Sequence, residues 1–198
     1  MTRAGNRTEI RITGYGGQGV IMTGYIFGKA AAIYDDVHST LTQSFGPEAR
    51  GSACSAALIV DEEFVTYPYL RGADVLIALS REGYEKYVGG LKEGGVLIYD
   101  EDLVTPRDGD LAADVERLGI PAMRIAEELG KRIVQNIVVV GFATAATGIV
   151  GKEAAKQAVE SSVPPATTSE EVRTRPMRGR SRSGPGSATM RVPGWSGL

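Results

Sequence analysis

Four glycines in one short stretch are the residues of this chain whose spacing is best suited to binding chemistry. They occur in Gly14-Tyr15-Gly16-Gly17-Gln18-Gly19, directly after the alternating apolar residues Ile10 and Ile12. This order predicts a strand that turns through glycines into a helix, and backbone amides at the start of such a helix attract anions. The residues expected to contribute are Gly16, Gly17, Gln18 and Gly19.

A second segment of similar density follows about one βα unit later. It reads Gln43-Ser44-Phe45-Gly46-Pro47-Glu48-Ala49-Arg50-Gly51-Ser52. Its glycines free the backbone and Pro47 stiffens it, so the loop can present Glu48 and Arg50 in a fixed relation. Arg50 could then hold a carboxylate or a phosphate through two hydrogen bonds. The candidate binding residues here are Ser44, Gly46, Pro47, Glu48, Arg50 and Gly51, and the alternative is an ordinary exposed loop.

The spacing of the first segment also fits the turn that binds the pyrophosphate of a dinucleotide. That fold places an acidic residue at the end of the second strand, where it binds the ribose. Asp35 and Asp36 instead precede the predicted second strand. A further alternative is that the glycines only allow positive φ and close packing of a helix on a strand. The polar amide of Gln18 could still point outward to a ligand or to the backbone of a partner.

Few other residues suit catalysis or metal binding. Cys54 is the only cysteine and His38 the only histidine. A single cysteine excludes an intrachain disulfide, and it excludes a cysteine zinc site or an iron-sulfur cluster built from this chain alone. Gly109-Asp110 with the later Asn136 superficially resembles the motif that binds thiamine diphosphate through a metal, but Leu111 stands where that motif has glycine. We therefore expect no catalytic residue, no metal site and no cofactor held by this chain alone, and a structural His38.

Alternating strands and helices provide the frame for these loops. Gly94-Gly95 breaks the pattern, and Asp61-Glu62-Glu63 is expected to turn between two antiparallel strands. The whole predicts a three-layer α/β/α fold with a mostly parallel sheet, a Rossmann-like first βα unit and an inserted antiparallel pair. Strands are predicted at 8–13, 37–42, 53–60, 64–67, 75–79, 96–99 and 121–125, and helices at 20–34, 81–87, 126–130, 133–150 and 152–161.

Composition indicates one folded domain and a tail. The chain has 198 residues, of which 42% are hydrophobic and 23% charged, within the range of globular proteins. We predict an N-terminal arm at 1–7, a domain at 8–168 and a disordered tail at 169–198 that is rich in Arg, Ser, Gly and Pro. No secretory signal is evident, and the apolar stretch 137–150 is too short to cross a bilayer, which predicts a cytoplasmic protein without a membrane partner.

The net charge of −2 is divided unevenly along the chain. The tail contains six arginines and two glutamates, which leaves 16 basic and 22 acidic residues before it. The arginine-rich run 173–182 could follow the phosphates of a nucleic acid. It has no interleaved aromatic residue for base stacking, since Trp195 lies well beyond it. A solvated tail is therefore favoured over a nucleic-acid partner.

Together the two glycine segments resemble the gamma subunit, or gamma domain, of 2-oxoacid:ferredoxin oxidoreductases. The similarity includes Asn136 through Thr147-Gly148 and runs from about Thr8 to Thr167. The second segment, followed by Asp61-Glu62-Glu63 and Tyr67-Pro68-Tyr69, is most similar to the 2-oxoglutarate branch, and the pyruvate, branched-chain 2-oxoacid and indolepyruvate enzymes share the architecture. Members usually end in a segment rich in Leu, Asn and Phe, so the tail here is either a lineage-specific extension or the product of a shifted reading frame.

The resemblance implies a complex that decarboxylates a 2-oxoacid on thiamine diphosphate, passes electrons through iron-sulfur clusters to ferredoxin and releases an acyl-CoA. In this family the thiamine diphosphate, magnesium and clusters belong to sister subunits, namely alpha, beta and a ferredoxin-like delta subunit. This chain would be a non-catalytic member whose glycine segments contact coenzyme A or another subunit. The alternatives are an independent nucleotide-binding oxidoreductase that uses the Gly14–Gly19 turn and an RNA-associated protein that acts through its tail.

The segment 137–146 supplies a further expectation about assembly. It is apolar on nearly every side of the predicted helix. A helix of that kind must be covered by protein all round. The sequence therefore predicts a broad contact with another subunit along this helix.

Overall fold

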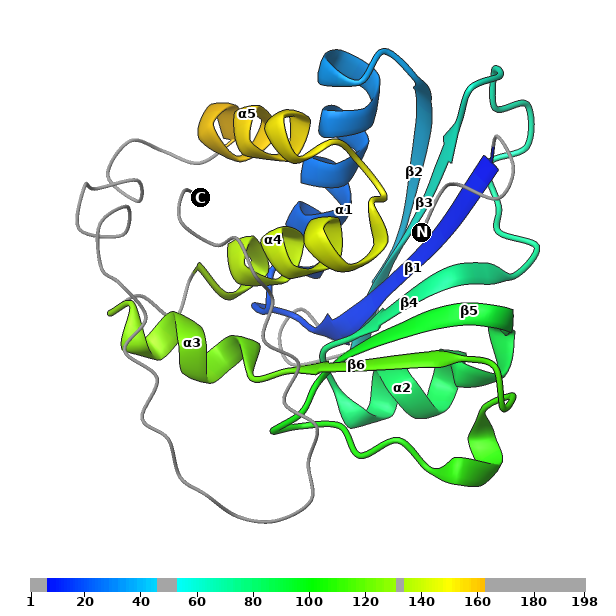
Figure 1. The fold of residues 1–198 in the computed structure, drawn as a ribbon, viewed down its shortest axis with the longest axis vertical. Coiled ribbons are helices and arrows are strands. Elements are labelled where there is room, and N and C mark those ends of the chain that lie inside the picture. Colours follow the sequence, from blue (N-terminus) through cyan, green and yellow to red (C-terminus); the bar gives the residue numbers. More distant parts are fainter. Residues whose placement is uncertain (1–6, 46–52, 131–133, 163–198) are drawn as a thin grey trace.

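A six-stranded sheet forms the centre of the protein. The computed structural model describes residues 7–45, 53–130 and 134–162. The strand order is β2-β3-β1-β4-β5-β6, and only β3 runs against the other strands (Figure 1). The mostly parallel sheet is therefore confirmed. The strands are β1 (Arg7–Tyr15), β2 (His38–Phe45), β3 (Ala53–Asp61), β4 (Ala73–Ala78), β5 (Leu91–Asp100) and β6 (Glu116–Ile120).

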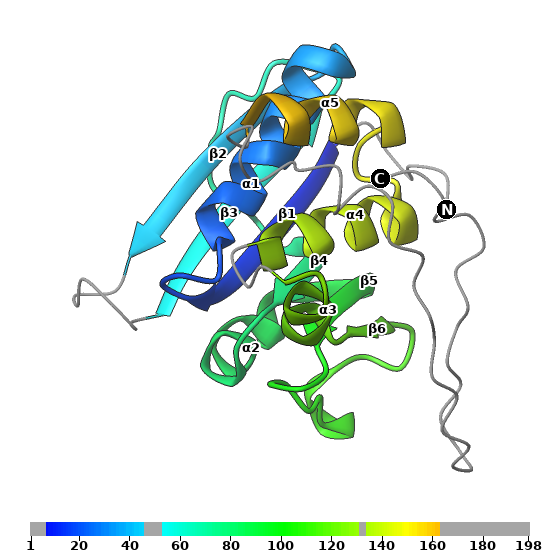
Figure 2. The same cartoon turned by 90° about the vertical axis from the view of Figure 1, so that its left-hand side faces the viewer.

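Helices cover the two faces of this sheet unequally. α1, α3, α4 and α5 lie on one face and α2 lies on the other (Figures 1 and 2). This is the expected three-layer arrangement, with a thin third layer. The helices are α1 (Val20–Lys29), α2 (Arg81–Tyr87), α3 (Ala122–Glu128), α4 (Gln135–Thr147) and α5 (Lys152–Ser162), with short helical turns at Ala30–Tyr34, Val88–Gly90 and Asp108–Asp110.

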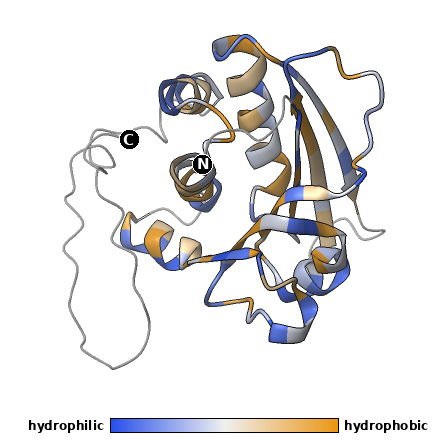
Figure 3. Ribbon diagram, turned by 45° about the vertical axis from the view of Figure 1, so that its right-hand side comes forward, coloured by the Kyte–Doolittle hydropathy of each residue, from blue (hydrophilic) through white to orange (hydrophobic). Residues whose placement is uncertain are grey.

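The alternation of side chains in the strands creates two hydrophobic clusters. In β1, Ile10 and Ile12 point toward α1 and α4 and belong to the larger cluster, together with Phe27 and Val139. The smaller cluster lies around Tyr84 of α2 on the opposite face. Figure 3 shows hydrophobic stretches along the strands between these layers. The period of two in a strand therefore decides which residues serve each layer.

The antiparallel pairing differs in place from the expectation. The strand predicted at 64–67 does not form, and the turn at Asp61 leads into an irregular loop. Antiparallel pairing instead joins β3 to both β2 and β1, so that Ala56 pairs with Gln43 and with Ile12. Phe64 is 76% exposed, and Pro68 lacks the amide that a central strand needs. The residues after Asp61 have a strand-like composition, but they face no hydrophobic core, so no strand forms.

The region around Pro121 was also assigned wrongly from the sequence. The last strand, β6, ends at Ile120, and α3 begins at Ala122. Proline is favourable at a helix start, since its fixed φ suits the first turn and its missing amide hydrogen is not needed there. The helix predicted at 126–130 is consequently the second half of a longer one.

Several other boundaries moved by a turn or less. The long helix predicted at 20–34 ends as a regular α-helix at Lys29 and continues as a π-helical turn over Ala30–Tyr34. The predicted break at Gly94 is a bulge inside β5, where φ is +67° and the register with β4 shifts. Gly148, with φ of +63°, ends α4. Glycine supplies these positive φ values without steric cost.

The apolar helix α4 is covered mainly by its own chain. Val139 and Ala143 are completely buried, and α1, α3 and α5 all contact the helix. This burial needs no second protein, so it does not support the broad subunit contact expected from the segment 137–146. The helix is instead part of the core that holds the start of α1.

Candidate functional site

The carboxyl ends of β1 and β4 meet where the chain changes direction across the sheet. After β1 the chain crosses one face in α1 and continues to β2 and β3, whereas after β4 it crosses the other face in α2 and continues to β5 (Figure 1). In open α/β sheets such a switch point is where ligands bind. The glycine segment lies here, since residues 16–19 connect β1 to α1.

Two of the glycines adopt backbone conformations that other residues rarely accept. Gly17 has φ of +103°, and Gly19, directly before α1, has φ of +73°. Gly16 and Gly17 are exposed, whereas Gly19 is only partly so. The expected strand–turn–helix is therefore present, and its tip presents backbone to the surroundings.

Gln18 bonds across the switch point. Its Oε1 accepts a hydrogen bond of 2.7 Å from the backbone amide of Tyr15, and its Nε2 donates one of 2.8 Å to the carbonyl of Leu79. A Cβ added to Gly14 would lie 2.5 Å from Gln18 Oε1, so glycine at 14 makes room for this side chain. The amide does not point outward, as the sequence had allowed, but ties the end of β1 to the end of β4.

The start of α4 packs against the last glycine of the turn. A Cβ added to Gly19 would lie 2.6 Å from Cβ of Asn136. Asn136 is itself buried. The glycine at 19 thus serves a close approach of two segments that are far apart in the sequence. The resemblance to the thiamine motif paired Asn136 with Asp110, but Asp110 contacts Tyr84 of α2 instead.

Sequence reasoning missed a buried carboxyl group at the end of β5. Asp100 is 0% exposed; its Oδ1 accepts a 3.1 Å hydrogen bond from the Asp102 amide and its Oδ2 a 3.2 Å bond from Gln135 Nε2. Burial raises the pKa of Asp100, and hydrogen bonds from the Asp102 and Met123 amides and from Gln135 oppose that rise only in part. An acidic residue that ends a buried apolar strand was the available signal. Its bonds fasten α4 to the sheet.

The second glycine segment can be placed only by the residues around it. Tyr15 pairs with Ala53, and Phe45 pairs with Cys54, so the residues that flank 46–52 lie at the same edge of the sheet as the first glycine turn. Ser44 is exposed in β2 opposite Ser55. The other candidates, Gly46, Pro47, Glu48, Arg50 and Gly51, lie outside the described residues, as do the tail and nearly all of the N-terminal arm.

Two residues considered for chemistry have ordinary surroundings. Cys54 belongs to the larger hydrophobic cluster, and burial raises the pKa of its thiol. His38 is exposed and makes an edge contact with the ring of Phe64. In the described part of the chain, no group of three or more His, Cys, Asp or Glu residues is placed to hold a metal ion. In the same part no helix has the length and apolarity to cross a membrane.

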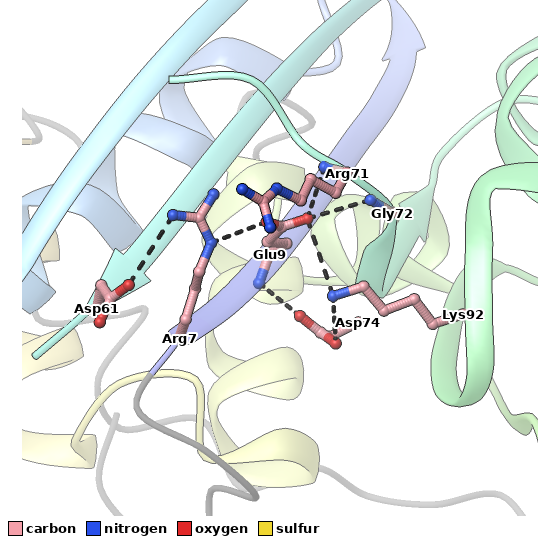
Figure 4. A network of polar contacts seen from close by, with 7 residues as sticks. All are labelled: Arg7, Glu9, Asp61, Arg71, Gly72, Asp74 and Lys92. Atoms are coloured by element: carbon pink, nitrogen blue, oxygen red, sulfur yellow. Dashed lines mark hydrogen bonds and ion pairs between the residues drawn. The ribbon is translucent and has the colours of Figure 1, made fainter. Parts of the chain in front are cut away.

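A charged network occupies the opposite edge of the sheet (Figure 4). Glu9 of β1 is buried, and its carboxylate accepts hydrogen bonds from Arg7 Nε (2.9 Å) and from the amides of Arg71 (2.8 Å) and Gly72 (3.1 Å). Lys92 lies 3.8 Å from it and also pairs with Asp74 at 2.9 Å. Burial alone would raise the pKa of Glu9, but these bonds and the charge of Lys92 together lower it. No pattern in the sequence predicted this cluster.

Comparisons with known proteins bear on the whole domain. The model of the pyruvate ferredoxin/flavodoxin oxidoreductase family matches residues 9–173. The 2-oxoglutarate synthase subunit KorC of Methanothermobacter thermautotrophicus is 46% identical over 165 residues, which cover 81% of this chain and 87% of that protein. The pyruvate synthase subunit PorC of the same organism is 33% identical over 162 residues, covering 79% and 85%.

A solved structure gives the same picture in three dimensions. The gamma subunit of a keto/oxoacid ferredoxin oxidoreductase from Geobacter sulfurreducens superposes with a TM-score of 0.70 at 41% identity. The match covers 83% of this chain and 92% of that one. The structural similarity therefore extends over most of both chains.

Proposed function

The chain belongs to the pyruvate ferredoxin/flavodoxin oxidoreductase family, as its two glycine segments predicted, and we propose that it is the gamma subunit of a 2-oxoglutarate synthase. In that role it completes a complex that oxidatively decarboxylates 2-oxoglutarate, forms an acyl-CoA and reduces ferredoxin. The alpha, beta and delta subunits supply thiamine diphosphate, magnesium and the iron-sulfur clusters. This chain supplies a scaffold.

The choice of 2-oxoglutarate as substrate rests on the sequence identities of two relatives from one organism. The 2-oxoglutarate synthase subunit is 46% identical and the pyruvate synthase subunit 33% identical, over alignments of nearly equal length. Because both relatives come from one organism, the comparison is not affected by differences in the divergence of species. The greater identity favours 2-oxoglutarate over pyruvate.

The geometry of the switch point supports a scaffold rather than a separate nucleotide-binding enzyme. Gln18 bridges β1 and β4 there, and Asn136 packs on Gly19. These contacts use the first glycine turn for close packing of the chain on itself. The exposed backbone of Gly16 and Gly17 remains at the tip, where another subunit or a ligand can reach it.

Reconstitution tests the proposal directly. The chain is co-expressed with its neighbouring subunits, and reduction of ferredoxin is measured with 2-oxoglutarate, pyruvate or a branched-chain 2-oxoacid in the presence of coenzyme A. We expect all four subunits to co-purify, activity greatest with 2-oxoglutarate, and loss of activity when this chain is omitted. A chain that stays alone, or that binds NAD or RNA tightly by itself, would contradict the proposal.

We also propose that the second glycine segment contributes to the coenzyme A channel. The residues that flank it lie at the carboxyl edge of β1, beside the first glycine turn. A guanidinium at Arg50 would hold a phosphate of coenzyme A through two hydrogen bonds. Arg50→Ala should raise the KM for coenzyme A, and Arg50→Lys should restore it only in part, because lysine lacks the planar fork. Unchanged coenzyme A kinetics in both variants would leave Arg50 without this role.

A further inference from the structure

The two outer strands of the sheet are protected to very different degrees. β6 has five residues and carries Glu116 and Arg117. β2 has eight residues, pairs with β3 without interruption, and contains no Asp, Glu, Lys, Arg or Pro. Edge strands of soluble proteins are normally blunted by shortness, charge, proline or a bulge, because an open edge templates the addition of another strand. β2 has none of these devices.

The outer side of β2 is open within the residues that the structure describes. Only β3 pairs with β2 among residues 7–45, 53–130 and 134–162, and Figure 2 shows β2 along the outside of the sheet. In an antiparallel pair, alternate residues direct their N–H and C=O groups away from the partner. A row of backbone donors and acceptors therefore faces outward along β2.

The sequence of β2 is nearly symmetric about its centre. Around Leu41 it reads Ser39-Thr40-Leu41-Thr42-Gln43. If two copies of β2 pair antiparallel about a two-fold axis at Leu41, Thr40 lies opposite the partner's Thr42, and Ser39 lies opposite the partner's Gln43. Threonine pairs across antiparallel strands are favourable, and the absence of charge removes repulsion between identical strands. The strand is thus complementary to itself.

α1 provides apolar cover beside this edge. A Cβ added to Gly24 would lie 2.9 Å from Cδ1 of Leu41, so this position of α1 faces β2. Successive helix residues are rotated by about 100°. Phe27 and Ala31, which are completely buried, therefore lie on the core side of Gly24, and Tyr25 lies on the side toward the open edge. Tyr25 is 48% exposed, and Lys29 Nζ lies 6.0 Å from the centre of its ring.

We propose that two copies of this chain associate through antiparallel pairing of β2 with β2 of the partner, about a two-fold axis at Leu41. The two sheets would then form one continuous sheet, with Tyr25 of each copy beside the new pair of strands. A stable interface buries about 1,200–2,000 Å² in total, so the pairing of two strands needs the additional contact from α1. This contact is separate from the proposed function. It does not involve the first glycine turn, and of the second glycine segment it uses only the residues that lie in β2, such as Gln43.

Paired substitutions test the axis as well as the dimer. Thr40→Lys with Thr42→Lys places lysine opposite lysine in the proposed pairing, and we expect a monomer. Thr40→Lys with Thr42→Glu places each new lysine opposite a new glutamate of the partner, and we expect the dimer to return. The measurement is the mass of the full chain by sedimentation, alone and with its co-purified subunits, over a range of concentrations. A control pair, Thr105→Lys with Ala113→Lys, adds the same charge at exposed positions outside β2 and should leave the dimer intact.

Hydrogen exchange tests whether β2 lies in the dimer contact, and circular dichroism tests whether the variants are folded. Alternate amides of β2 should exchange more slowly as the concentration of the wild-type chain rises, and not in the double-lysine variant. Circular dichroism confirms that each variant is folded; if the double-lysine chain unfolds, the wild-type mass and the lysine–glutamate variant still decide. A wild-type chain that remains monomeric, equal masses for the two double variants, or protection of β2 only by a sister subunit would overturn the proposal.

Discussion

The two edges of the sheet join distant segments by opposite means. At the amino edge, Glu9 collects two cationic side chains and two backbone amides around one buried carboxylate (Figure 4). At the carboxyl edge, the neutral amide of Gln18 and the missing side chain of Gly19 bring β1, β4 and α4 together. One edge is held by charge and the other by close packing of neutral groups.

This difference suits the proposed role of the chain as a scaffold. A buried ion network fixes geometry strongly but becomes costly once any partner is removed. The neutral latch at the carboxyl edge keeps the backbone of Gly16 and Gly17 exposed without placing a fixed charge beside it. A subunit that presents a loop to an anionic ligand or to another protein gains from a turn whose own bonds, from Gln18 to Tyr15 and Leu79, use no carboxylate. Variants at each edge should therefore fail in different ways.

The largest loss of stability is expected at the amino edge. In Glu9→Gln, the new NH2 group must face either Arg7 Nε or the amides of Arg71 and Gly72, all of which are donors. Breaking a buried charged cluster in this way typically costs about 3–5 kcal/mol of unfolding free energy. The matched control is Glu93→Gln at an exposed position of β5, which should change stability by about 0.5 kcal/mol or less. Urea unfolding of the wild type and the two variants measures the difference. Equal losses of unfolding free energy in the two variants would show that the network around Glu9 does not stabilise the fold.

Close packing at the carboxyl edge predicts the next largest effect. Gly19→Ala combines a positive φ with a Cβ only 2.6 Å from Cβ of Asn136, whereas Gly17→Ala combines a positive φ with open space. Strain alone costs about 1–3 kcal/mol, and overpacking adds about 1–3 kcal/mol. Gly19→Ala should therefore be the more destabilising change in thermal unfolding. Adding Asn136→Gly should recover part of the loss at Gly19 and none at Gly17, and the absence of any recovery would remove the packing explanation.

A substitution of Gln18 distinguishes a structural role, in which it joins β1 to β4, from direct contact with a ligand. Gln18→Glu keeps the acceptor for the Tyr15 amide but loses the donor to the carbonyl of Leu79. An unsatisfied polar group of this kind costs about 1–3 kcal/mol. We expect lower stability with an unchanged KM for coenzyme A in the reconstituted complex. A raised KM at unchanged stability would instead assign Gln18 to ligand binding.

The glycine turn at the carboxyl edge could be anticipated from the sequence, whereas the charged network at the amino edge could not. The strand–glycine–helix order at Gly14–Gly19 is local, so its pattern of residues predicted the observed turn. Apart from Arg7, the partners of Glu9 come from much later in the chain: Asp74, whose carboxylate accepts a hydrogen bond from the Glu9 amide, is 65 residues away. Nothing in the pattern of β1 distinguishes a buried glutamate from an exposed one. The same reason hid the bond between Asp100 and Gln135, which depends on the docking of α4.

The two buried carboxyl groups predict opposite and smaller effects of pH on stability. The pKa of Glu9 is lowered in the folded protein, so its contribution is present above its unfolded pKa of about 4.3 and is lost as the pH falls through the folded value. The pKa of Asp100 is raised, so its contribution is present below its unfolded pKa of about 3.9 and is lost as the pH rises through the folded value.

Measuring unfolding free energy against pH for two variants resolves these contributions. Glu9→Gln should flatten the loss of stability in acid. Asp100→Asn should become more favourable relative to the wild type as the pH rises, because asparagine does not ionise and the Gln135 amide can turn to offer its oxygen to the new NH2 group. Glu93→Gln should leave the profile unchanged. If Asp100→Asn instead loses stability equally at every pH, its hydrogen bonds rather than its buried charge govern how α4 is held to the sheet.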